Sequence, residues 1–139
     1  MIVGSGRVGS AVARQMLDEG HEVSVLDEDP EAIAQLEKGL DDSWVDSGGS
    51  FTVGTALEME ALEEAGIERA DAFVASTDGD NTNLVIAQIA QKRFNIKTVV
   101  VRVLDPARAS WYEEQGLRTV CPTKIAIEML EEAVHEGMG

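Results

Sequence analysis

Short apolar runs rich in β-branched residues alternate along the chain with longer segments of helical periodicity. After the first run, for example, Val8, Val12 and Met16 recur every four residues and form one apolar stripe. Such alternation is typical of an α/β protein in which a parallel sheet carries helices on both faces. We therefore expect a doubly wound parallel sheet of six strands, at residues 2–3, 22–26, 51–53, 72–76, 98–103 and 119–121.

Turn and capping residues lie at the boundaries between the predicted strands and helices. Asp29-Pro30 and Asp105-Pro106 each place a capping carboxylate before a proline that suits the first helical position. Gly20, Gly66 and Gly116 lie where three helices should end. The similar stretches VSVLDEDP and VVVRVLDP indicate two equivalent halves of the sheet, each with a strand whose final turn starts a helix.

Two segments depart from the regular pattern. The first strand has only two residues before a glycine, whereas a buried central strand usually has about five or six. Residues 41–50, DDSWVDSGGS, lack periodicity, and we expect a loop that leads into the third strand.

The first strand runs directly into a glycine-rich turn, IVGSGRVGS, which opens an amphipathic helix. A glycine triplet in this context is typical of a Rossmann-like nucleotide site. Gly4 permits a tight turn, Gly6 lets a pyrophosphate approach the backbone, and Gly9 allows close packing of helix against sheet. The helix N-terminus adds free N–H groups and about half a positive charge, which favours an anion.

Asp27 ends the second predicted strand, where its carboxylate can accept hydrogen bonds from both hydroxyls of an adenosine ribose. A 2′-phosphate there would meet Asp27, Glu28 and Asp29 together. Each like-charge contact at about 4 Å costs roughly 1 kcal/mol in water and about 4 kcal/mol near a protein surface, so NADP is disfavoured. The alternative is a surface aspartate that helps to cap the next helix, a role that Asp29 already fills.

Four further residues are candidates for the same crevice. Arg7, in the glycine loop, and Arg102, within VVVRV, could each contact a phosphate. Arg7 could instead be solvated, and Arg102 could lie at an edge or pair with Asp78 or Asp105. The polar segment STDGDNTN should bring Thr77 and Asp78 to the crevice from the other half of the sheet. That segment lacks the ligand spacing of a calcium loop, so we expect no metal site.

The composition narrows the possible partners and the location. The 139 residues suffice for one compact domain, and 11 basic against 26 acidic residues give a net charge of −15, which repels nucleic acid and anionic lipid. Cys121, the only cysteine, cannot form an internal disulfide, nor a zinc site with His21 and His135. With no secretory leader and no apolar run of about 20 residues, we expect a reducing, cytoplasmic location and no direct membrane insertion.

Four stretches together resemble one known family: GSGRVGS, VLDEDP, LEEAGIERADAFVASTDGDNTNLVIAQIA and VVVRVLDP. They are similar to the KTN domain, also called the RCK or TrkA N-terminal domain, of cytoplasmic regulators of Trk-type potassium uptake. The resemblance covers essentially the whole chain. The combination of AGIERADAFVA, a T-x-x-D-N-x-N run and R-V-x-D-P is far more specific than the glycine triplet alone.

The resemblance implies a Rossmann-like domain that binds NAD(H) or an adenine nucleotide such as AMP, ADP or ATP. It also implies dimers that build a homo- or hetero-oligomeric ring and gate a membrane-embedded potassium transporter or channel subunit. The protein would then lie in the cytoplasm, held at the inner face of the cell membrane by that partner.

The resemblance also assigns individual residues by position. It implies a pyrophosphate site at Gly4, Ser5, Gly6, Arg7 and Val8, a ribose site at Asp27, far-side contacts at Thr77 and Asp78, and a phosphate contact at Arg102. Thr55 falls at the adenine side. There the chain departs from the family, because it reads Gly54-Thr55-Ala56 where the family usually has G-D-A/G-T.

The closing helix, about residues 123–136, bears on assembly. Its apolar surface is wider than one packing face requires and comprises Ile125, Ala126, Ile127, Met129, Leu130, Ala133 and Val134. In the family the corresponding helix reaches a neighbouring subunit; the alternative is an ordinary helix that covers the sheet. We expect residues 1–139 to be a single nucleotide-binding domain without the C-terminal ligand-binding subdomain of many relatives.

These features favour sensing over catalysis. A dehydrogenase needs a substrate-binding region and an acid or base beside the nicotinamide, and the predicted sheet uses nearly the whole chain. His21 is expected at the wrong end of the sheet, His135 near the chain end, and Cys121 without a histidine to activate it. We therefore predict no catalytic residues and a nucleotide-sensing regulatory subunit. The alternatives are a small NAD-dependent oxidoreductase or the cofactor-binding half of one, and the cytosolic portion of a longer channel polypeptide.

Overall fold

A computed structural model describes residues 1–139 and contains one sheet of six strands, all parallel, in the order β3-β2-β1-β4-β5-β6. This order reverses between β1 and β4, which confirms the predicted doubly wound, Rossmann-like sheet. The strands are β1 (Ile2–Val3), β2 (Ser24–Asp27), β3 (Ser50–Val53), β4 (Ala72–Ala75), β5 (Thr98–Arg102) and β6 (Arg118–Val120).

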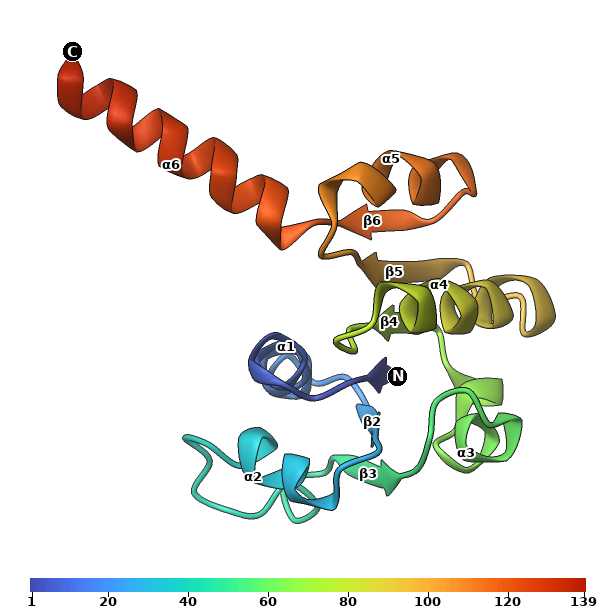
Figure 1. Cartoon of the computed structure of the whole chain (residues 1–139). Helices are drawn as coiled ribbons and strands as arrows, with labels where there is room; N and C mark the ends of the chain where they lie inside the picture. Colours follow the sequence, from blue (N-terminus) through green and yellow to red (C-terminus); the bar gives the residue numbers. More distant parts are fainter.

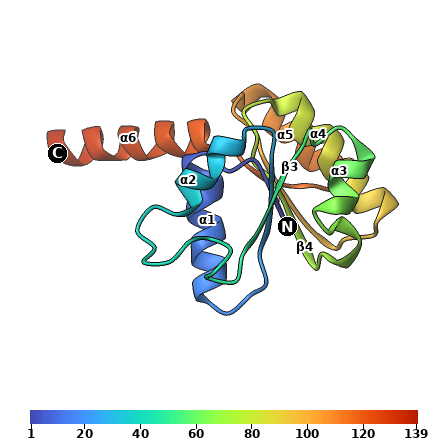
Figure 2. The same ribbon diagram turned by 90° about the horizontal axis from the view of Figure 1, so that it is seen from below.

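Helices cover both faces of the sheet (Figure 2). On one face lie α1 (Arg7–Asp18) and α2 (Ile33–Leu36), the latter preceded by the 3-10 turn η1 (Pro30–Ala32). The other face carries α3 (Met59–Glu64), the 3-10 turn η2 (Ile67–Arg69), α4 (Asp80–Gln88), its π-helical extension η3 (Ile89–Arg93) and α5 (Pro106–Glu114).

Both predicted aspartate caps form. The side chain of Asp29 accepts a hydrogen bond from the backbone N–H of Glu31, and that of Asp105 accepts one from Ala107. Each satisfies a backbone donor at the start of a helical segment, which the following proline helps to preorganise. The caps place both segments directly after the carboxyl ends of β2 and β5.

The central strand β1 is as short as the sequence predicts, because Gly4 turns the chain with φ +92°. The backbone pairing nevertheless continues on both sides of it. Gly4 N–H donates to the Leu26 carbonyl at 2.9 Å, and Ser76 N–H donates to the Val3 carbonyl at 2.8 Å. The glycine loop is therefore fastened to the ends of both neighbouring strands.

The core consists of two apolar clusters, one on each face of the sheet. Trp44, fully buried under α1 and α2, belongs to the smaller cluster, although it lies in the stretch predicted as a loop. Its indole N–H donates to the Ser50 carbonyl at 3.0 Å, and its backbone N–H donates to the Glu37 carboxylate at 2.7 Å. The segment is irregular as predicted, but this side chain anchors it to the core.

The last helix, α6 (Pro122–Met138), projects away from the rest of the molecule (Figure 1). None of its residues is buried, and Met129 and Leu130 are 63% and 67% exposed. It therefore does not cover the sheet, which was the alternative for this segment. No helix in the structure combines the length and the apolar character that a membrane span requires.

Candidate functional site

A cleft of about 660 Å³ lies at the carboxyl ends of β1, β2, β3 and β4, where the strand order reverses. Open parallel sheets bind ligands at this position, because the loops of the two halves diverge there. Four segments form its walls: the glycine loop, the β2–α2 connection, the β3–α3 connection and the β4–α4 loop.

The three glycines of the loop have different surroundings. A Cβ on Gly9 would lie 2.0 Å from the Gly4 carbonyl oxygen, so only glycine permits this approach of α1 to the loop. A Cβ on Gly4 would lie 2.6 Å from the Ser76 carbonyl oxygen. A Cβ on Gly6 would meet no protein atom within 4 Å, and Gly6 lines the cleft. Packing within the protein therefore requires glycine at positions 4 and 9, whereas the free space at Gly6 faces the cleft.

The N-terminus of α1 offers unpaired backbone donors to this space. The first helical hydrogen bond of this turn runs from Ser10 N–H to the Gly6 carbonyl at 2.9 Å. The preceding N–H groups at the start of α1 have no intrahelical acceptor, as at any helix N-terminus. No side chain caps this end. The arrangement suits a phosphate, which brings the acceptor oxygens that the helix lacks.

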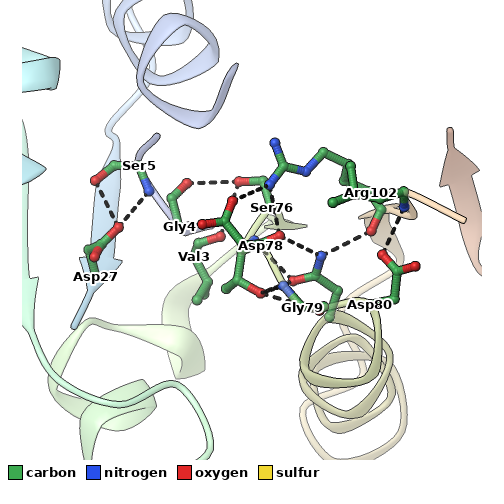
Figure 3. A network of polar contacts seen from close by, with 12 residues as sticks. Val3, Gly4, Ser5, Asp27, Ser76, Asp78, Gly79, Asp80 and Arg102 are labelled. Atoms are coloured by element: carbon green, nitrogen blue, oxygen red, sulfur yellow. Dashed lines mark hydrogen bonds and ion pairs between the residues drawn. The ribbon is translucent and has the colours of Figure 1, made fainter. Parts of the chain in front are cut away.

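Asp27, at the end of β2, is hydrogen bonded to the glycine loop (Figure 3). Its Oδ2 accepts from the backbone N–H of Ser5 at 2.8 Å and from the Ser5 hydroxyl at 3.2 Å. Its Oδ1 accepts from the backbone N–H of Asp29 at 2.9 Å. Asp27 lines the cleft and is only partly buried, so its carboxylate can also accept from a ligand hydroxyl.

The far wall of the cleft is the β4–α4 loop, which contains Thr77 and Asp78. The Thr77 hydroxyl donates to the Oδ1 atom of Asn83 at 2.6 Å, so it is directed toward the protein interior. The Asp78 carboxylate lies 3.4 Å from the Arg102 guanidinium, which also donates to the Thr77 carbonyl at 2.8 Å. Arg102 Nε is buried and has no hydrogen-bond partner. Arg102 thus holds the β4–α4 loop through contacts on the side away from the cleft, and its Nε–H is a donor without an acceptor.

The structure brings most of the predicted site residues together. Seven of them line the cleft: Gly4, Ser5, Gly6, Asp27, Thr55, Thr77 and Asp78. Three do not: Arg7 and Val8, exposed at the start of α1, and Arg102 behind the far wall. Thr55 lies between Gly54 and Ala56 in the wall formed by the β3–α3 connection.

Several lining residues were not singled out from the sequence. Ala32 and Gln35 reach the cleft from the helical segments after β2, and Ser76, Gly79 and Thr82 from the far wall. The Ser76 hydroxyl donates to the Gly4 carbonyl at 2.8 Å and thereby links the two walls. Ser76, Gly79 and Thr82 belong to the quoted segment STDGDNTN, whereas Ala32 and Gln35 carry no local signal for a site.

All charged side chains that line the cleft are acidic. Asp27, Glu28, Asp29, Glu31 and Asp78 line it, and no lysine or arginine does. A further phosphate beside the β2–α2 connection would therefore meet carboxylates without a cation to compensate. Within the cleft itself, positive potential comes from the α1 N-terminus.

The residues considered for acid–base or nucleophilic chemistry lie elsewhere. His21 is exposed in the turn before β2, and His135 is on α6. Cys121 is buried as the N-cap residue of α6, with its sulfur 3.9 Å from the Leu104 carbonyl oxygen. None of the three lines the cleft. No group of three or more His, Cys, Asp or Glu side chains is arranged to hold a metal ion.

The family comparison and the comparison with known proteins indicate the same protein family. The family model of the TrkA-N domain matches residues 1–123. The Trk system potassium uptake protein TrkA of Streptomyces coelicolor is 37% identical over 138 residues, which cover 99% of this chain and 59% of that protein. The chain thus spans little more than half of this relative.

Solved structures show the same fold. The Shewanella denitrificans Kef CTD in its AMP-bound form is 26% identical with a TM-score of 0.75, and the match covers 96% of this chain and 78% of that one. The GsuK channel bound to NAD is 19% identical with a TM-score of 0.78, and the match covers 99% of this chain and 23% of that one.

Proposed function

The chain belongs to the TrkA-N domain family, and from this membership we propose that it is a non-catalytic regulatory subunit that senses NAD(H) or an adenine nucleotide. The observation that carries the proposal is the open space beside Gly6 in the cleft, which lies between the free N–H groups of α1 and the Asp27 carboxylate. A nucleotide fits both ends of this space, because its phosphate accepts hydrogen bonds and its ribose hydroxyls donate them.

In the proposed complex the glycine loop, Gly4 to Val8, holds the phosphate or pyrophosphate, and Asp27 holds the ribose. Thr55 lies toward the adenine, and Thr77 and Asp78 face the far part of the ligand. Arg102 reaches a phosphate by exchanging its 3.4 Å contact with Asp78 for a ligand oxygen. The bound AMP in the similar Kef domain supports a nucleotide in this fold, and the NAD of the GsuK channel is compatible with a longer ligand.

The charge of the cleft argues for NAD(H), AMP, ADP or ATP over NADP. The additional 2′-phosphate would lie beside Asp27, Glu28 and Asp29. At an effective dielectric constant near a protein surface, each such contact at about 4 Å costs about 4 kcal/mol. No cation lines the cleft to offset this repulsion.

We further propose that the domain, residues 1–139, acts in an oligomer and regulates a membrane-embedded Trk-type potassium transporter or channel subunit from the cytoplasmic side. The name of the Streptomyces relative supports potassium uptake as the process. The exposed apolar surface of α6 supports association with another subunit, in a dimer that builds a ring. For nucleotide to regulate such an assembly, it must bind one conformation of the ring more tightly than another.

Isothermal titration calorimetry of the protein with NAD, NADH, NADP, AMP, ADP and ATP tests the ligand. We expect binding of at least one of the nucleotides without a 2′-phosphate, with NADP weaker by about tenfold or more. Absence of heat with all six compounds would refute nucleotide sensing. A spectrophotometric assay of NAD reduction with alcohols and 2-hydroxy acids tests the alternative, since sustained turnover would identify an oxidoreductase.

A further inference from the structure

Asn83 is a fully buried polar residue in the first turn of α4. Its Oδ1 accepts from the backbone N–H of Thr77 at 3.0 Å and from the Thr77 hydroxyl at 2.6 Å. Its Nδ2 donates to the Thr77 carbonyl and to the Arg102 carbonyl, both at 3.0 Å. Both side-chain hydrogens and the amide oxygen are thus engaged, so the side chain has a single satisfied orientation.

These four hydrogen bonds fasten the far wall of the cleft. Thr77 is held through its N–H, its hydroxyl and its carbonyl. The next two residues are exposed: Asp78 contacts Arg102, and the Gly79 carbonyl accepts a hydrogen bond from the backbone N–H of Asn83 at 2.9 Å. The same amide group holds the carbonyl of Arg102, whose guanidinium donates back to the Thr77 carbonyl at 2.8 Å. Asn83 therefore links the chain just after β4 to the last residue of β5.

The near wall of the cleft, formed by the glycine loop and the β2–α2 connection, does not depend on this residue. Asp27 is held by Ser5 and by the backbone of Asp29, and the N-terminus of α1 is fixed by the packing of Gly9 on Gly4. The side-chain link between the walls runs from the hydroxyl of Ser76, at the start of the far wall, to the carbonyls of Val3 and Gly4. Loss of Asn83 should therefore disturb one side of the site and leave the other intact.

We infer that Asn83 is a positioning residue for the far half of the ligand site: it holds the Thr77–Gly79 backbone and Arg102 in the arrangement that receives the part of a nucleotide beyond the first phosphate. The inference rests on the proposed nucleotide function. It requires that Asn83 govern the affinity for a ligand that reaches the far wall and not the affinity for one confined to the near wall.

The test compares NAD, which extends across the cleft, with AMP, which ends at the glycine loop. Both are titrated by calorimetry into the wild-type protein and the Asn83→Leu variant, which keeps the branched shape and the number of heavy atoms of the side chain and removes all four hydrogen bonds. We expect the affinity for NAD to fall about tenfold or more, while that for AMP stays within about threefold. Asn81→Ala is the matched control. Asn81 is an exposed asparagine of the same helix that contacts Arg108, and we expect its substitution to leave both affinities unchanged.

A merely structural role for Asn83 predicts a different result. Both affinities would then fall together, in proportion to the loss of folded protein, and this outcome would overturn the inference while the proposed function stands. Binding of AMP without binding of NAD by the wild-type protein would overturn it as well. If the wild-type protein binds neither compound, nor any other nucleotide, the proposed function fails first and the inference with it.

A second variant keeps the test decisive if Asn83→Leu does not fold. Thr77→Val removes the hydroxyl that donates to Asn83 and accepts from the Gly79 N–H, and it retains the two hydrogen bonds between Asn83 and the Thr77 backbone. We expect the same selective loss, about threefold for NAD and none for AMP. Equal affinities for NAD in this variant and in the wild type would overturn the inference.

Discussion

The backbone N–H of Ser5 donates a 2.8 Å hydrogen bond to the carboxylate of Asp27, which lies 22 positions away in the sequence. This contact joins the glycine loop after β1 to the end of β2 (Figure 3). The residue proposed to hold the ribose thus also orders the loop proposed to hold the phosphate. The glycine loop and the end of β2 are therefore held in place by the same hydrogen bond.

Replacement of Asp27 by alanine should affect stability and binding together. It removes charge-assisted hydrogen bonds to the loop, so we expect the free energy of unfolding to fall by about 2 kcal/mol in urea denaturation. The affinity for AMP and NAD should fall about tenfold or more in calorimetry. Asp105→Ala is the control, because it removes an aspartate cap outside the cleft and should cost about 1 kcal/mol without a change in affinity. Unchanged nucleotide affinity in Asp27→Ala would contradict the assigned ribose site.

Two alanine substitutions in the glycine loop should have different effects, one on binding and the other on stability. In Gly6→Ala the new Cβ meets no protein atom, so the free energy of unfolding should change by less than about 1 kcal/mol. The same Cβ enters the space proposed for phosphate, and the affinity for nucleotides should fall by at least about tenfold. In Gly9→Ala the Cβ would lie 2.0 Å from the Gly4 carbonyl oxygen, and we expect a destabilisation of about 3 kcal/mol. Thermal denaturation with and without nucleotide distinguishes an effect on stability from an effect on binding. Normal nucleotide binding by Gly6→Ala would argue against a phosphate at this loop.

Tyr112 should make the protein sensitive to alkaline pH. Burial raises the pKa of its hydroxyl above the ordinary value of 10.0, and the negative charge of Asp80 raises this pKa further, against a smaller opposing effect of Arg108. The folded state therefore retains the proton more strongly than the unfolded state. The resulting stabilisation is complete below about pH 10 and is lost as the pH rises through the raised pKa.

Urea denaturation at about pH 8 and about pH 11 checks this expectation. Tyr112→Phe loses the 2.7 Å hydrogen bond to the Asp80 carbonyl and should be less stable by about 1 kcal/mol at neutral pH. The variant should then lose less stability than the wild type between the two pH values. An equal loss in both proteins would show that this hydroxyl does not titrate as expected.

The exposed surface of α6 should control association. Leu130 is 67% exposed, and no residue of α6 is buried in the protomer. Leu130→Asn should therefore shift the protein from oligomer toward monomer in sedimentation velocity, while its free energy of unfolding changes by less than about 0.5 kcal/mol after correction for association. Glu131→Gln, on the polar side of the same helix, should leave the oligomer unchanged. A wild-type protein that sediments as a monomer at high concentration would contradict the proposed interface.

Local sequence features determined much of the fold. The six strands, the aspartate caps before Pro30 and Pro106, and the turn at Gly4 each depend on residues within a few positions of one another, through periodicity, capping or backbone freedom. The location of the cleft followed from the same features, because the carboxyl ends of parallel strands must lie at one edge of the sheet.

Only the tertiary structure decided how the walls of the cleft are held. The Ser5–Asp27 contact, the Ser76–Gly4 link and the Asn83 hydrogen bonds join segments that no local pattern relates, separated by up to 72 positions. The same holds for Trp44, which lies in an irregular segment and is buried only because α1 and α2 leave space for its ring. Periodicity shows which face of an element is apolar, but the partner of a polar side chain depends on which segments the fold brings within about 3 Å of it.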